Sequence, residues 1–105
     1  MEENNRTWLS TEAVWPLLEK HQNTVFHTAK GLEFTYIIKG GEMFVDRRSK
    51  SITKATVEKA YEKVKEDNGQ TIHGPKKLSV FGAPYIWAVF AGLGLVGTGK
   101  RDAAK

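Results

Sequence analysis

Residues 32–47 read LEFTYIIKGGEMFVDR, and the alternation of apolar and polar side chains in this stretch decides the fold class. Apolar residues recur at every second position on both sides of Gly40-Gly41, which is the period of a half-buried strand. A Gly-Gly pair tolerates the positive φ angles of a two-residue hairpin loop, so we expect antiparallel strands at 32–39 and 42–47. A further strand at 24–29 would complete a three-stranded meander.

The register about this turn sets the two faces of the predicted sheet. It places Lys39 opposite Glu42, and successive cross-strand pairs then alternate between the faces. On the reverse face, which is otherwise polar, Ile37 pairs with Phe44. We expect this pair to be either a second, smaller core or an exposed contact patch for a protein. The expected core face consists of Leu32, Phe34, Tyr36, Ile38, Met43 and Val45.

The helix expected after the meander has the clearest local signals in the chain. Thr53 is a favourable N-cap, and Ile52 and Val57 have the spacing of a hydrophobic staple. The helix should run to about Asp67 and end at Asn68-Gly69. Its apolar stripe, at the spacing i, i+3, i+4 and i+7, consists of Val57, Ala60, Tyr61 and Val64.

Two further helices complete the predicted architecture. One spans about 11–21, where Pro16 indicates either a start near residue 14 or a kink. The other begins at Pro84 and ends near Ala91, and it is apolar on every side, so it should be buried. Residues 78–81 fit either a short strand or one helical turn.

The sequence therefore predicts one small α+β domain over residues 1–94: an N-terminal helix, a three-stranded antiparallel meander and two helices, the last one buried. Residues 95–105 are expected to form a flexible C-terminal tail. The side chains expected in the core are Phe34, Tyr36, Val57, Ala60, Val64, Trp87 and Phe90.

Composition narrows the class of protein. The 105 residues are 40% hydrophobic, which suits one small globular domain. The absence of cysteine excludes a disulfide scaffold, a thiolate zinc site and a cysteine nucleophile, and it favours a reducing, cytoplasmic location. No run approaches the ~20 apolar residues that span a bilayer, so we expect no membrane partner.

The sequence contains no strong catalytic, metal or cofactor motif. His21, His27 and His73 are scattered without ligand spacing. Glycine patterns at 92–97 and 94–100 match nucleotide-binding fingerprints in letters, but they lack the βαβ context that gives those fingerprints their chemistry. We therefore expect no catalytic residues, no metal, no cofactor and no enzymatic activity.

The distribution of charge is more informative than its total. The net charge is +4, from 16 basic and 12 acidic residues. The window 47–59 holds five basic residues and one acid, so it alone accounts for that excess. These cations lead into a helix N-terminus, whose free amides and positive dipole favour anions such as phosphate.

Residues 52–64, ITKATVEKAYEKV, resemble the recognition helix of GntR-type winged-helix repressors. In that family a capping Ser or Thr, a basic residue, a Thr-Val pair and a following Ala recur. The resemblance implies that Thr53, Lys54, Thr56 and Lys59 approach DNA. The family places another helix just before this one, whereas a strand and a basic loop precede it here.

These observations predict a small basic nucleic-acid-binding module, with a regulatory role as one option and DNA favoured over RNA. The alternative is a protein-binding adaptor or inhibitor, for example a phage or mobile-element protein acting on a nucleic-acid-handling enzyme, with Ile37 and Phe44 as contacts. The sequence leaves the oligomeric state open. The residues predicted to contact nucleic acid are Arg47, Arg48, Lys50, Thr53, Lys54, Thr56 and Lys59.

Overall fold

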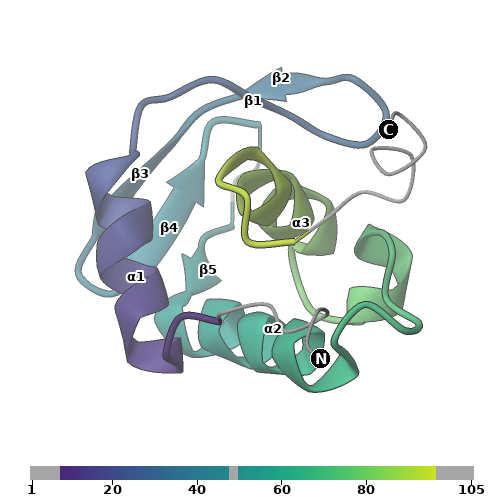
Figure 1. Ribbon diagram of the computed structural model, residues 1–105. Helices are drawn as coiled ribbons and strands as arrows, with labels where there is room; N and C mark the ends of the chain where they lie inside the picture. The colour runs from purple at the N-terminus through teal and green to yellow at the C-terminus, as the bar shows by residue number, and fades with distance from the viewer. Residues whose placement is uncertain (1–7, 48–49, 97–105) are drawn as a thin grey trace.

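Three α-helices, one short 3₁₀ helix and two small antiparallel sheets make up the computed structural model, which describes residues 8–47 and 50–96 (Figure 1). In Figure 1, α2 runs along the bottom of the molecule, α1 stands at the left, and β1 and β2 arch over α3 at the top. The predicted α+β class is confirmed: one helix, antiparallel strands, then two helices with the last one buried. The helices are α1 (Thr11–Lys20), α2 (Lys54–Asp67), α3 (Ala83–Gly92) and the short 3₁₀ helix η1 (Pro75–Leu78), and the strands are β1 (Phe26–His27), β2 (Glu33–Phe34), β3 (Tyr36–Lys39), β4 (Glu42–Val45) and β5 (Ile52–Thr53).

The hairpin at the centre of the chain has the predicted register. Strands β3 and β4 pair so that Lys39 lies opposite Glu42 and Ile37 lies opposite Phe44. Both turn glycines have positive φ angles, 57° at Gly40 and 79° at Gly41, which glycine adopts readily because it has no Cβ. The two-residue loop therefore specifies how the strands align.

The predicted meander is wrong in detail, because the strand expected at 32–39 is interrupted at Thr35. Its first part, β2, pairs with β1 in a separate two-stranded sheet. Its second part, β3, belongs to the three-stranded sheet β3-β4-β5, in which residues expected only at the start of a helix supply the third strand. The Asp46 carboxylate stabilises the interruption by accepting hydrogen bonds from the Thr35 amide (3.2 Å) and hydroxyl (3.4 Å).

All seven side chains predicted to form the core are buried, and none is more than 5% exposed. Two members of the predicted core face differ. Leu32 is 46% exposed, because it lies in the turn that connects β1 to β2 rather than under the helices. Ile38 is half-buried at the edge of the core.

Helix α2 forms as its local signals predict. The Thr53 side chain caps it by accepting a hydrogen bond from the Thr56 amide at 3.2 Å. Ile52 and Val57 are fully buried, as a hydrophobic staple requires. Asn68 ends the helix in the left-handed conformation, with φ of 49°.

The remaining segments resolve the alternatives that the sequence leaves open. Helix α1 begins at Thr11 and contains Pro16, so the later start is wrong. Residues 78–81 form neither the strand nor the helical turn expected there: η1 ends at Leu78, because Ser79 is left-handed with φ of 52°, and residues 79–81 are irregular. Val96 packs on the core, and residues 97–105, most of the predicted tail, lie outside the described residues.

Within the described chain, every helix is too short or too polar to cross a bilayer.

Candidate functional site

Three of the residues predicted to contact nucleic acid meet at the start of α2. The hydroxyl oxygens of Thr53 and Thr56 are 2.9 Å apart. The Lys54 amide donates a 3.0 Å hydrogen bond to the Gly41 carbonyl, which fixes the first turn of α2 against the β3-β4 hairpin. The Lys54 side chain is exposed, so the start of α2 presents two hydroxyls and one cation to solvent.

The other cations near α2 are more widely spread. Lys50 is exposed and lies two residues before β5. Lys59 is exposed but follows Lys54 by five residues, which turns it about 140° around the helix axis. Lys59 follows Thr56 by three residues and therefore lies on the same side of α2 as Thr56. Lys54 and Lys59 thus face different directions.

Arg47 lies at the opposite end of the sheet from the start of α2. Strand β5 pairs with Glu42 and Met43, so β5 and the start of α2 lie at the Glu42 end of β4. Arg47 is therefore separated from the Glu42 end of β4 by about 16 Å of extended chain. The surface that the sequence predicts to be continuous from Arg47 to Lys59 is therefore divided. The pairing of β5 with β4, which separates Arg47 from the start of α2, could not be read from local patterns. Arg48 lies outside the described residues.

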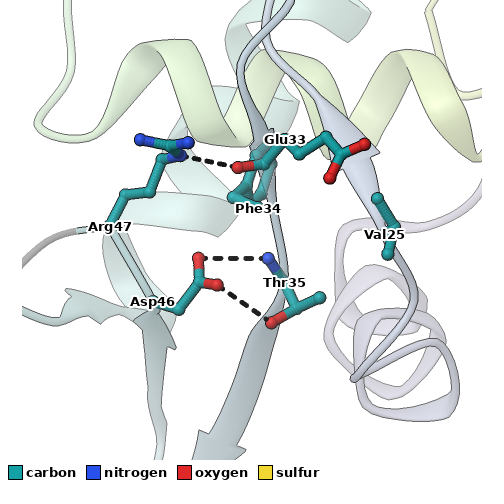
Figure 2. Close-up of a pocket in the computed structure, with 6 residues that line it drawn as sticks. All are labelled: Val25, Glu33, Phe34, Thr35, Asp46 and Arg47. Carbon is teal, nitrogen blue, oxygen red and sulfur yellow. Dashed lines mark hydrogen bonds between the residues drawn. The ribbon is translucent and has the colours of Figure 1, made fainter.

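The Arg47 side chain turns toward β2 and not toward α2. Its Nε donates a 2.6 Å hydrogen bond to the Glu33 carbonyl, beside a pocket of about 430 Å³ (Figure 2). Figure 2 also shows the Asp46 carboxylate engaged with Thr35, while the Glu33 carboxylate points away from Arg47. The polar groups of this pocket therefore hold the interruption between β2 and β3.

The face of the β3-β4-β5 sheet that points away from the core is open to solvent. Ile37 is 39% exposed and Phe44 is 40% exposed, so the prediction of a second core is wrong and the pair forms a surface patch. Because cross-strand neighbours share a face, this surface also includes the row of Lys39, Glu42 and Thr53. We call these five residues the outer sheet face.

The electrostatics of the outer sheet face are mixed. Lys39, Lys50 and Lys54 are exposed, and none of them forms an ion pair with another described residue. Glu42 lies between Lys39 and Thr53 in the row, and its carboxylate accepts a hydrogen bond from the Ser51 hydroxyl. Two acids, Glu42 and Asp46, which lies two residues after Phe44 and is engaged with Thr35, therefore accompany the three cations on and around this face. Sequence reasoning placed Lys39 on this face but left it out of the candidate site, although the hairpin register was enough to find it.

The titratable groups elsewhere form no metal centre within the described residues, where no three His, Cys, Asp or Glu side chains cluster suitably. His27 Nε2 lies 3.6 Å from a Glu33 carboxylate oxygen, and both side chains are more than half exposed. His73 Nε2 lies 2.9 Å from the Gly69 carbonyl oxygen.

Comparisons of the chain with protein-family models, with curated proteins and with solved structures found no match. The resemblance of residues 52–64 to a winged-helix recognition helix implies a helix immediately before α2. The structure has strand β5 there instead.

Proposed function

We propose that the chain is a small nucleic-acid-binding module that holds a single strand on the outer sheet face, with the start of α2 beside it. The observation that carries this proposal is the 40% exposed ring of Phe44, on an open sheet face flanked by lysines that form no ion pair with another described residue. Bases of any sequence can stack on such a ring, while the lysines attract the phosphate backbone.

A single strand fits this surface better than a duplex does. Reading a duplex requires a helix or a two-stranded ribbon that enters the major groove. Helix α2 packs its apolar stripe against the rest of the domain, and its two exposed lysines face different directions. An open sheet with an aromatic side chain needs no groove, because the unstacked bases of a single strand can stack directly on the exposed ring. In this proposal the chain acts as a binding module and not as an enzyme.

The first test is a titration of labelled oligonucleotides of about 12 nucleotides, a length that covers the usual site size of one small domain. Oligo(dT), oligo(U) and a matched duplex are compared by fluorescence anisotropy at several salt concentrations. We expect the single strands to bind more tightly than the duplex. The DNA and RNA arms measure whether the sugar 2′-hydroxyl matters, and we expect DNA to bind at least as well as RNA.

Lysine variants test the electrostatic part of the proposal. In K50Q/K54Q, the slope of log K against log salt should shrink by about 0.7 for each single-strand phosphate contact that is lost. The matched control is K20Q/K65Q, which removes two positive charges away from the outer sheet face and should keep the slope. Equal slopes in the two double variants would contradict the proposed surface.

Phe44 variants test the stacking part. F44Y keeps an aromatic ring and should retain affinity, whereas F44L keeps an apolar side chain without a ring and should lose about tenfold or more, since stacking contributes about 1–3 kcal/mol per base. Circular dichroism checks that both variants are folded. Absence of binding by the wild-type protein at the lowest salt concentration would refute the nucleic-acid proposal.

The second candidate function is a protein-binding adaptor or inhibitor, and the exposed Ile37–Phe44 pair favours it independently. An apolar protein contact should tolerate F44L better than a charged substitution such as F44E. Affinity capture from nuclease-treated lysate separates the two functions. A stoichiometric protein that survives nuclease and is lost in F44E would support the adaptor, whereas recovery that disappears with nuclease would support direct nucleic-acid binding.

A further inference from the structure

A second surface feature lies away from the outer sheet face, where two distant parts of the chain form a pocket of about 520 Å³. One wall is the turn at residues 28–32 that connects β1 to β2. The other wall is the segment 75–85, which contains η1 and the start of α3. The apolar lining includes Leu32, Val80, Ala83, Pro84 and Tyr85. We call it the Lys30–Lys76 pocket after the two cations that line it.

The first wall is held rigidly by its own hydrogen bonds. The Thr28 amide donates to the Leu32 carbonyl at 2.9 Å, and the Thr28 hydroxyl accepts from the Leu32 amide at 3.1 Å. The Gly31 amide donates to the Thr28 carbonyl at 2.8 Å, and Gly31 has a φ of 87° that suits a tight turn. The turn that carries Lys30 is therefore pre-formed.

The second wall is anchored in the core. Leu78 is fully buried at the end of η1, and its carbonyl accepts a 2.7 Å hydrogen bond from Lys63 Nζ. The Tyr85 ring meets the Phe34 ring edge-on, with 5.0 Å between their centroids, which joins α3 to β2. Because both walls are ordered before binding, a ligand would lose little affinity to ordering of the protein.

The charge of the pocket has one sign. Lys30 and Lys76 are exposed and are the charged residues of the described lining, which includes no Asp or Glu. Neither lysine forms an ion pair with another described residue. An apolar lining with two ammonium groups complements a molecule that has an apolar body and a negative end.

We propose that the Lys30–Lys76 pocket binds a small organic anion with an apolar body, of the class of aliphatic or aromatic carboxylates. The volume lies in the usual range of small-molecule pockets, about 300–1,000 Å³. A stable protein partner would cover about 800 Å² of surface, which is far more than a recess of this size offers. This proposal also accounts for Leu32, whose exposed side chain would be covered by the ligand.

The experiment uses 8-anilinonaphthalene-1-sulfonate, an apolar anion that fluoresces when it leaves water. We expect saturable binding to the full chain and competition by dodecanoate, but little competition by dodecyltrimethylammonium, which has the same chain with the opposite charge. In K30Q/K76Q, affinity for the probe should fall about fivefold or more, since two charge contacts are lost. K20Q/K65Q, the matched control, should bind normally.

Amide chemical-shift mapping places the bound probe independently of any variant. Shifts that concentrate in residues 28–32 and 75–85 would support the proposal. Absence of saturable binding, equal affinity in K30Q/K76Q and wild type, or shifts confined to the outer sheet face would each overturn it. The outcome is independent of nucleic-acid binding, because the two surfaces share no residue.

Discussion

The hydroxyl of Tyr36 donates a 2.7 Å hydrogen bond to the carbonyl oxygen of Leu18, and this bond joins β3 to the last turns of α1. Both residues are 1% exposed, so the bond is made away from water. Burial raises the pKa of the Tyr36 hydroxyl well above its ordinary value. The neutral form of Tyr36 is therefore part of the folded state.

Removing this hydroxyl should destabilise the domain. In Y36F the ring still fills its site, but the buried Leu18 carbonyl loses one of its two donors, the other being the His21 amide. We expect a loss of about 1–2 kcal/mol in the free energy of unfolding, measured by urea denaturation at neutral pH. An unchanged midpoint would show that the hydrogen bond contributes nothing.

The buried Tyr36 hydroxyl should also make the free energy of unfolding depend on pH in the alkaline range. The native pKa of Tyr36 is raised, so above about pH 10 the unfolded chain loses this proton while the folded chain keeps it. Stability should therefore be complete below about pH 10 and fall as pH rises further, by at most about 1.4 kcal/mol per pH unit from this group. Denaturation curves of Y36F between neutral and alkaline pH should show a smaller decline than those of the wild type.

Gly82 should tolerate no side chain. Its φ is 76°, and an added Cβ would lie 2.8 Å from Cγ1 of the fully buried Ile52 and closer still to its Cδ1. We expect G82A to cost about 2–4 kcal/mol, from left-handed strain together with overpacking. The matched control is G69A, where φ is 78° but nothing lies within 4 Å, so only the strain of about 1–2 kcal/mol applies. Equal melting temperatures of the two variants would contradict the close approach of Gly82 to Ile52.

The two faces of the sheet should respond differently to truncation of phenylalanine. Phe34 is 1% exposed and Phe44 is 40% exposed. F34A should therefore cost roughly 3–5 kcal/mol, whereas F44A should cost under about 1 kcal/mol, mostly through its cross-strand contact with Ile37. Thermal unfolding of both variants tests this difference, and a large loss in F44A would mean that the patch is structural.

Asp67 should make the segment after α2 sensitive to acid. Its carboxylate accepts hydrogen bonds from the backbone amides of Ile72 and Thr71, which lower its pKa. The stabilising effect of these hydrogen bonds is fully present above the ordinary pKa of aspartate, about 4. It is lost as pH falls through the lowered pKa of Asp67 in the folded protein. Acidification below about pH 4 should move the amide resonances of residues 70–73 and speed their hydrogen exchange, while D67N should show little of this pH dependence. Identical titrations of the two proteins would contradict the prediction.

The candidate sites show where sequence reasoning stopped. The exposed Ile37–Phe44 pair and its neighbour Lys39 follow from the hairpin register alone, because alternation assigns each residue to a face. The separation of Arg47 from Lys54 does not follow from it, since it depends on the chain turning back to pair β5 with β4. The Lys30–Lys76 pocket could not be predicted either, because its two walls are more than 40 residues apart in the chain.

What the sequence by itself determined is local. The Gly40-Gly41 loop and period-two alternation specify the hairpin, and the Thr53 cap, the staple and the Val57–Val64 stripe specify α2, because each signal acts within a few residues. The tertiary structure alone decided the interruption at Thr35 and the exposure of Leu32. Both depend on how distant segments pack: the Asp46 carboxylate accepts hydrogen bonds from Thr35, and Leu32 lies in the β1–β2 turn, across a pocket from residues 75–85. No pattern along the chain encodes these contacts, since they arise only when the elements pack together.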